Sequence, residues 1–454
     1  MSDAALADAL AAIAGPDAVR APRQADLMDD TEGAGLRGRA DAVVTPATAA
    51  DVAAVVAWCY DRDVPITPRG AGTGYSGGAL PDGGVVLSTA GLTRIRSFEP
   101  ALWRMEAEAG VVTGTIQRRA REEGLRYPVD PGSQESSTIG GNIATNAGGP
   151  HSFAHGVTRA WVTGLEAVLA PGELVRLGGP VRKDVAGYDL VSLLCGSEGT
   201  LGIVTAAWLR LVPAPAVAYP IAALLPDARA GQEALEAVLV SGATPAALEF
   251  LDAGALREAP APFLPPGASG FLVIAEVEGT SEAEARADRA DVLEALSGAG
   301  AVHAPDERGE VAALWRWRDG VGHAVSARHG GKLSEDIGVP MDRLAETVEA
   351  TVAIGARHGL DAVSWGHAGD GNVHATFLID PADEAQRTSA AAAARDLFDL
   401  ARELGGTVSG EHGIGLLKNG ELRRQWPPAA VAAHQAVKAA LDPKGLLNPG
   451  KKLA

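Results

Sequence analysis

The spacing of apolar residues changes period along the chain, which predicts strands and helices in alternation. Within residues 41–70, apolar runs near both ends flank a stretch, 51–60, whose apolar residues recur at helical spacing. Thr48 stands just before that stretch, where a hydroxyl can cap the first helical turn. We therefore expect a strand, a capped helix and a second strand in this segment.

The same alternation continues in the second half of the chain. The pattern predicts a strand at 270–279 followed by an amphipathic helix at 281–300. A further helix at 342–359 is expected to lead into a strand at 361–365. Helices and strands on this scale predict an α+β or α/β protein.

Two stretches rich in proline interrupt the pattern. Residues 213–226 are rich in Pro and Ala, and residues 259–270 are typical of a surface loop. We place a domain boundary near residue 215.

The composition narrows the class of protein. A chain of 454 residues, 46% hydrophobic and 21% charged, is typical of a globular enzyme with two or three domains. Its net charge of −18 argues against nucleic acid, whose phosphates need a basic surface. Two cysteines, Cys59 and Cys195, are too few for a disulfide framework or a four-thiolate iron–sulfur cluster, so a partner would have to supply any such cluster.

The first sixteen residues predict a short Ala-rich helix that ends at Gly15-Pro16. Asp3 and Asp8 stand where a secretory signal would carry a basic region. Nowhere in the chain do eighteen apolar residues follow one another. We expect no membrane span and a cytoplasmic location.

Three glycine-rich segments in the first half predict a binding site for phosphate groups. Residues 68–81 read PRGAGTGYSGGALP and fit the spacing G-x-G-x-x-G, but that motif must open a helix, and here Gly, Pro and a strand follow. Such loops can still present backbone N–H groups to phosphate oxygens. Similar loops at 137–149 and 196–205 indicate that one long ligand contacts all three.

A hairpin is predicted at residues 361–380, where apolar segments flank Asp370-Gly371. With these two residues as the turn, His367 would lie directly opposite His374, with their Cβ atoms about 5 Å apart. The pair could bind a divalent metal or simply stack. Glu411 could complete a set of two histidines and one carboxylate; zinc is the first candidate, and manganese and iron(II) also fit such ligands.

Together these segments resemble a known family. The motifs PRGAGTGYSGG, PGSQESSTIGGNIATNAGG and KDVAGYDLVSLLCGSEGTLGIVT resemble the FAD domain of the vanillyl-alcohol oxidase/p-cresol methylhydroxylase superfamily. Further on, WGHAGDGNVH, SGEHGIGLLK and LDPKGLLNPGKKL resemble its branch of D-lactate dehydrogenase, the glycolate oxidase FAD subunit and D-2-hydroxyglutarate dehydrogenase. The resemblance runs from about residue 40 to the C-terminus.

The resemblance implies a set of FAD-binding residues. They are Pro68, Arg69, Gly70, Ala71, Gly72, Thr73, Gly74, Ser76, Gly77, Pro131, Gly132, Ser133, Thr138, Gly140, Gly141, Asn142, Thr145, Gly148, Glu198, Gly199, Ile203 and Asn448. Many members bind FAD covalently through a histidine in the first loop. That loop has no histidine here, so noncovalent FAD is expected, with His151 and His155 as the histidines near the flavin segments.

The resemblance also implies the chemistry. It places a metal at His367, His374 and Glu411 and a catalytic base at His412. Arg318 and Lys332 match residues that bind substrate. Thr376 stands at a substrate-binding position that is asparagine in the hydroxyglutarate enzymes.

Four residues after Arg318 the hydroxyglutarate enzymes carry a threonine, and this chain has Gly322. The resemblance therefore favours a short monocarboxylate such as D-lactate or glycolate. Its oxidation would transfer a hydride to FAD.

The predicted fold is α+β, with a two-subdomain FAD-binding domain and an α/β cap domain built on an antiparallel sheet. The expected divisions are a helical segment at 1–37, the FAD domain at 38–214, the substrate or cap domain at 215–404, and a tail at 405–454 that returns to the FAD domain. Two alternatives stay open: an oxidase of another alcohol, or an electron-transfer subunit active only within a complex. The electron acceptor is unspecified, and a homodimer is one candidate assembly.

Overall fold

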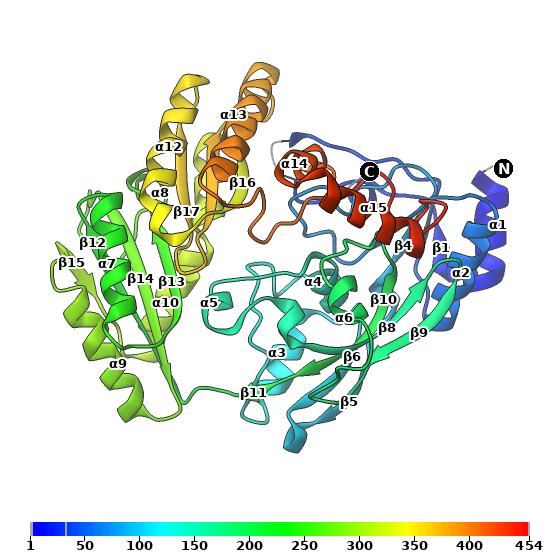
Figure 1. The fold of residues 1–454 in the computed structure, drawn as a ribbon, viewed down its shortest axis with the longest axis horizontal. Coiled ribbons are helices and arrows are strands. Elements are labelled where there is room, and N and C mark those ends of the chain that lie inside the picture. Colours follow the sequence, from blue (N-terminus) through cyan, green and yellow to red (C-terminus); the bar gives the residue numbers. More distant parts are fainter. Residues whose placement is uncertain (1–2, 32–33, 453–454) are drawn as a thin grey trace.

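The computed structural model describes residues 3–31 and 34–452, which form two α+β halves (Figure 1). The first half carries two sheets and both described ends of the chain. The second half is built on one large sheet, and the short helix α5 (Ser152–His155) reaches towards it from the first.

The smaller sheet of the first half has the strand order β1-β2-β4-β3. Its strands are β1 (Val19–Arg20), β2 (Ala42–Val44), β4 (Val85–Ser88) and β3 (Ile66–Arg69). β4 pairs in parallel with both β2 and β3. The helix α2 (Ala49–Asp61) connects β2 to β3, and the Thr48 hydroxyl caps it by accepting the N–H of Asp51. The predicted strand, capped helix and strand are confirmed.

The second sheet of this half is antiparallel, with the order β5-β6-β10-β8-β9. Its strands are β5 (Ile95–Glu99), β6 (Arg104–Glu108), β10 (Ile203–Arg210), β8 (Val162–Leu169) and β9 (Glu173–Gly178). A small pair, β7 (Leu125–Arg126) with β11 (Val212–Pro213), lies near the crossing into the second half. Besides α2 and α5, the first half contains the helices α1 (Asp3–Ala14), α3 (Thr113–Arg121), α4 (Ile139–Thr145) and α6 (Leu190–Leu194).

The large sheet is antiparallel throughout, with the order β15-β12-β14-β13-β17-β18-β16. Its strands are β15 (Ala301–His303), β12 (Val217–Leu225), β14 (Phe271–Gly279), β13 (Pro245–Leu251), β17 (Ala362–His367), β18 (Asn372–Leu378) and β16 (Lys332–Gly338). The strands predicted over 270–279 and 361–365 are thus present as β14 and β17.

The two faces of this sheet are covered differently. One face packs against α7 (Ala228–Val240), α9 (Glu282–Ala295), α12 (Leu344–Arg357) and α13 (Glu384–Glu403). The other face is partly covered by α8 (Ala253–Glu258), α10 (Arg308–Asp319) and α11 (Val321–His329). Because alternate residues of a strand point to opposite faces, residues such as Trp365, His367 and His374 share this second face.

The proline-rich stretch 213–226 contains a strand that its composition does not suggest. Pro220 lies within β12, opposite Glu276 of β14. On its other side β12 pairs with β15 only at residues 222–224. β12 is therefore unpaired on that side at Pro220, and proline is found in strands mainly where one side is unpaired.

The last part of the chain packs against the first half. It contains α14 (Asn419–Gln425) and α15 (Pro428–Leu441), and Val437 and Leu441 of α15 pack against the core of the five-stranded sheet. Leu447 forms a parallel bridge with Ile66 and is buried in the same core as α2. Across the described residues, no helix combines the length and apolarity that crossing a bilayer needs.

Candidate active site

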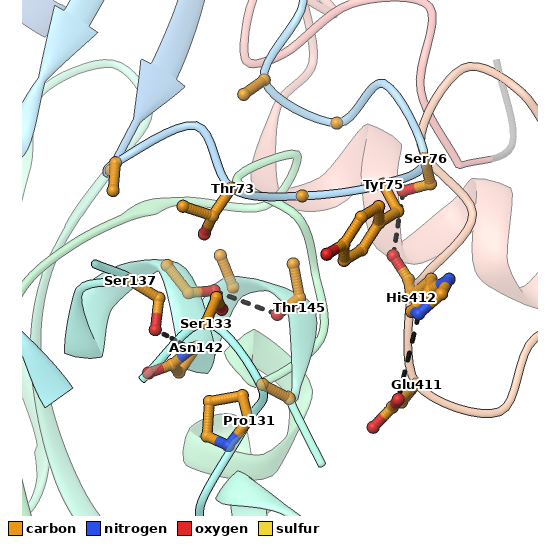
Figure 2. Close-up of a pocket in the computed structure, with 18 of the residues that line it drawn as sticks. Thr73, Tyr75, Ser76, Pro131, Ser133, Ser137, Asn142, Thr145, Glu411 and His412 are labelled. Atoms are coloured by element: carbon orange, nitrogen blue, oxygen red, sulfur yellow. Dashed lines mark hydrogen bonds and ion pairs between the residues drawn. The ribbon is translucent and has the colours of Figure 1, made fainter. Parts of the chain in front are cut away.

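One continuous cavity is lined by all three glycine-rich segments (Figure 2). The first segment follows β3, the second contains α4, and the third leads into β10. In Figure 2 the loop that carries Thr73, Tyr75 and Ser76 faces Ser133 and Thr145 across open space. The prediction that one long ligand contacts three loops thus has a cavity of suitable form.

Local hydrogen bonds fix these loops. The Thr138 hydroxyl caps α4 by accepting the N–H of Gly141, and the Asn142 amide donates to the Ser137 hydroxyl. Gly72 adopts a φ of +77° while the Arg69 guanidinium fills the space that a Cβ would need, so this position requires glycine.

Most of the predicted cofactor residues line the cavity. They are Pro68, Arg69, Gly70, Ala71, Gly72, Thr73, Gly74, Ser76, Pro131, Gly132, Ser133, Thr138, Gly140, Gly141, Asn142, Thr145, Gly148, Glu198, Gly199 and Ile203. The other two predicted residues, Gly77 and Asn448, do not line the cavity. Gly77 turns the first loop, and the Asn448 amide donates to the carbonyls of Gly78 and Glu198, which joins two loops from outside.

The cavity has room for a cofactor beside its glycines. A Cβ at Gly74 or Gly132 would meet no atom of the described residues within 4 Å, although both glycines line the cavity. His151 does not line it, and both of its ring nitrogens contact carboxylates: Nδ1 lies 2.5 Å from Asp130 and Nε2 lies 2.8 Å from Glu276. This arrangement supports the expected noncovalent binding.

The predicted hairpin forms, but the predicted register between its two strands is wrong by two residues. His367 pairs with Asn372, and His374 pairs with Trp365. The loop has four residues, 368–371, because the Gly371 carbonyl accepts the N–H of Val339 and the Gly371 N–H donates to Ala368. A shift of two residues keeps side chains on the same face, so the two histidines are diagonal neighbours on that face, with ring centroids 5.3 Å apart.

Glu411 joins the histidine pair from a distant segment. Its Oε1 lies 3.4 Å from His367 Nε2 and 3.5 Å from His374 Nε2. The other ring nitrogen of His374, Nδ1, is buried and has no hydrogen bond to the described residues. Ligand atoms of a tetrahedral zinc lie about 3.4 Å apart, because each bond is about 2.1 Å long. These three residues therefore fit a divalent metal.

Burial and the neighbouring charges shift the pKa values of all three residues. Burial alone would lower the pKa of His367, but the carboxylates of Glu249 and Glu411 outweigh it and raise the pKa to about 10. Burial would raise the pKa of Glu411, but the neighbouring histidines, His367 first, lower it to about 2. Burial also lowers the pKa of His374 well below its usual value, so this imidazole is neutral and can act as a ligand.

His412 lies beside the triad and lines the cavity. Its ring stacks on His374, with centroids 5.2 Å apart, and Tyr75 of the first loop lies 4.7 Å away on a tilted plane (Figure 2). The Ser76 hydroxyl donates to the His412 carbonyl, which attaches the first loop to this segment.

A buried carboxylate supports the backbone of this segment. Asp336 accepts the N–H groups of Glu411 and His412, at 2.6 and 3.0 Å, and lies 3.5 Å from His412 Nδ1. Burial opposes its ionisation, but Lys418 and His412 hold the pKa of Asp336 far below the usual value. Asp336 is therefore an anion that fixes the geometry of residues 411–412.

The predicted substrate residues divide into two groups. Arg318 and Lys332 are buried side chains that line the cavity, and Lys332 Nζ lies 5.2 Å from the centroid of the Trp365 ring. Thr376 does not line the cavity. It is fully buried, and its hydroxyl bonds to Ser334, which does line it.

Sequence reasoning missed Tyr75, Glu249 and Asp336. Glu249 lies within a wholly buried strand, and its carboxylate contacts His367 and Arg318. A signal for Glu249 was an isolated acid inside the apolar segment PAALEFL, because a buried charge needs partners. For Tyr75 the sequence carried no such signal.

A second cluster of side chains that could bind a metal lies between the two halves and consists of His151, Glu276 and Glu278. Its carboxylates already have protein partners. Arg126 forms an ion pair with Glu278 at 2.5 Å, and Trp315 donates its indole N–H to Glu276. We interpret this group as a structural ion cluster.

Known proteins resemble this chain in sequence and in structure. Residues 40–178 match the family model described as FAD binding domain, and residues 214–452 match that of FAD linked oxidases, C-terminal domain. The chain is 37% identical to glycolate oxidase subunit GlcD of Bacillus subtilis, over 91% of this chain and 89% of that protein. It is 32% identical to D-lactate dehydrogenase of Anaerostipes hadrus, over 91% and 90% of the two chains.

A third relative is mitochondrial D-2-hydroxyglutarate dehydrogenase of Bos taurus, 34% identical over 92% of this chain and 78% of that one. Among solved structures, 4-ethylphenol oxidase from Gulosibacter chungangensis superposes with a TM-score of 0.79 at 20% identity, covering 99% of this chain and 97% of that one. p-Cresol methylhydroxylase superposes with a TM-score of 0.78 at 19% identity, covering 99% and 96%. These structures share the predicted fold.

Proposed function

The chain belongs to the family of FAD-linked oxidases, and on that premise we propose that it oxidises a short D-2-hydroxy acid, of the D-lactate or glycolate type, to the 2-oxo acid. One observation carries the proposal. His367, His374, Glu411, His412 and Arg318 all line the cavity whose other wall is formed by the glycine-rich loops. A substrate there would lie between these side chains and the cofactor.

A flavin cofactor and a metal ion, neither of them part of the polypeptide, would complete the site. The glycine-rich loops would hold FAD noncovalently, and His367, His374 and Glu411 would hold one divalent metal. When bound, FAD supplies a hydride acceptor and the metal supplies a Lewis acid that lowers the pKa of a hydroxyl.

The protein's own residues would orient the acid and move its proton. The Arg318 guanidinium suits the substrate carboxylate, because its fork can donate two parallel hydrogen bonds. His412 would remove the hydroxyl proton at a ring nitrogen, with its backbone fixed by Asp336 and its ring in contact with those of His374 and Tyr75. These two ring contacts limit rotation of the base.

Two features favour a short acid over hydroxyglutarate. Gly322 lines the cavity without a side chain, and Thr376 lies outside it, bonded to Ser334. A second carboxylate buried without partners would cost several kcal/mol. Lys332 is the cation nearest to Gly322, and it is the residue that could reverse this preference.

The test is a substrate panel with a redox dye in place of the natural acceptor. We expect the highest kcat/KM with D-lactate or glycolate, loss of turnover after chelation, and recovery when one divalent metal per chain is restored. A clear advantage for D-2-hydroxyglutarate would refute the substrate assignment. Full activity with no bound metal would refute the proposed role of the metal.

A second function has one observation in its favour, because the relative with 37% identity is named as a subunit of glycolate oxidase. The chain would then transfer electrons only within a complex. Dye-linked turnover by the purified chain would argue against that alternative.

A further inference from the structure

Glu249 is a charged residue in an unusual place. It lies within β13, all seven residues of which are buried, and its own side chain is fully buried. Leaving an ionised carboxylate in such surroundings is costly unless partners compensate. The identity of those partners indicates what the residue does.

The first partner is a predicted metal ligand. Glu249 pairs directly with His367 across the β13–β17 ladder, and its Oε1 lies 2.6 Å from His367 Nδ1. A hydrogen bond at Nδ1 fixes the tautomer and the ring plane, so Nε2 is left facing Glu411 and His374. Carboxylates that accept from the outer nitrogen of a metal-bound histidine raise its strength as a ligand.

The second partner is the arginine predicted to bind substrate. The other carboxylate oxygen, Oε2, forms an ion pair with Arg318. The Arg318 Nε is buried with no hydrogen bond to the described residues, while the side chain lines the cavity. Glu249 thus holds one end of the guanidinium and leaves donors for another acceptor.

We propose that Glu249 is a positioning residue that orients His367 towards the metal and Arg318 towards the substrate carboxylate. The inference rests on the proposed function. One side chain then supports both halves of the substrate-binding site, so its loss should weaken metal and substrate binding together.

The test is the variant Glu249→Gln, purified with FAD and stripped of metal. Zinc affinity is measured by competition with a chromophoric chelator, and KM and kcat with the preferred acid are measured at saturating zinc. We expect zinc to bind about 10–100-fold more weakly. KM should rise more than kcat falls, because Arg318 loses its anchor while His412 keeps its own support from Asp336.

The chain offers a matched control. Glu276 is another buried carboxylate of the same sheet, but it contacts His151 and Trp315 rather than the site. Glu276→Gln should leave zinc affinity at the wild-type value. A loss of zinc affinity in both variants would show a general effect of removing buried charge and would overturn the proposal.

Folding is checked by FAD content and by the midpoint of thermal unfolding. If Glu249→Gln does not fold, Glu249→Asp keeps the charge but shortens the side chain, and it should also bind zinc more weakly. A folded Gln or Asp variant with wild-type zinc affinity and KM would overturn the proposal. Absence of zinc binding by the wild type would instead refute the proposed metal site.

Discussion

Single residues of the candidate site are held in position by contacts with distant parts of the chain. The His412 ring contacts those of His374 and Tyr75, while its backbone N–H donates to Asp336. It is therefore held by groups that do not depend on its own ring nitrogens. Its removal should disturb chemistry more than structure.

We predict that His412→Asn lowers turnover by about 10²–10⁴-fold, the usual contribution of a general base. FAD and metal content should stay at wild-type values, because the predicted ligands of both are unchanged. Steady-state assays with the dye, together with flavin absorbance and elemental analysis, measure these quantities. His434→Asn, an exposed histidine on α15, is the control. Turnover close to that of the wild type would place the base elsewhere.

At the scale of elements, the glycine-rich loops and the hairpin show what can be predicted from sequence. The loops were identified because glycine spacing is local information, and twenty of the predicted cofactor residues line one cavity. The two histidines share a face because β-strand alternation is also local. Their register was wrong because the loop is tied to Val339, which no local pattern indicates.

Long-range pairing explains the other misses. Glu249 and His367 are 118 residues apart, and Asp336 and His412 are 76 residues apart. Only the order of strands in the sheet brings these pairs together. The division into domains at residues 38–214 and 215–404 stays a prediction.

We predict that Gly74→Val weakens FAD binding by about 10-fold or more, because overpacking typically costs 1–3 kcal/mol. Gly74 lines the cavity, and a Cβ at this position meets no atom of the described residues within 4 Å, so the fold should tolerate it. Flavin retained after gel filtration measures the effect, and acid precipitation should release FAD into the supernatant. Gly298→Val, where a Cβ also meets no atom, is the control outside the cavity. Equal flavin retention in both variants would contradict the predicted loop contact.

At the scale of the whole molecule, a polar cluster joins the two halves. His151 bridges Asp130 of the first half to Glu276 of the large sheet, and Arg126 pairs with Glu278. Burial alone would lower the pKa of His151, but Asp130 and then Glu276 outweigh it and raise the pKa well above 6.5.

We predict that His151→Gln destabilises the protein by about 1.5–3 kcal/mol at pH 6, as expected for hydrogen bonds to charged groups. A raised pKa in the folded state contributes stability that is complete below the unfolded value and is lost as the pH rises through the folded one. The gap in free energy of unfolding between the two proteins should therefore narrow at alkaline pH. Urea unfolding at pH 6 and at pH 9 or above tests the trend; a gap independent of pH would contradict it.

The late segment that completes the first half has a consequence for biosynthesis. Ser76 bonds to His412, and Asn448 bonds to Gly78, so contacts separated by more than 300 residues fix the first loop. A ribosome adding about 5–20 residues per second would need on the order of 20 seconds or more to cover that interval. During this time the nascent first half lacks the residues that brace its glycine-rich loops. Flavin capture should therefore follow synthesis of residues 412–448 rather than that of the first half alone.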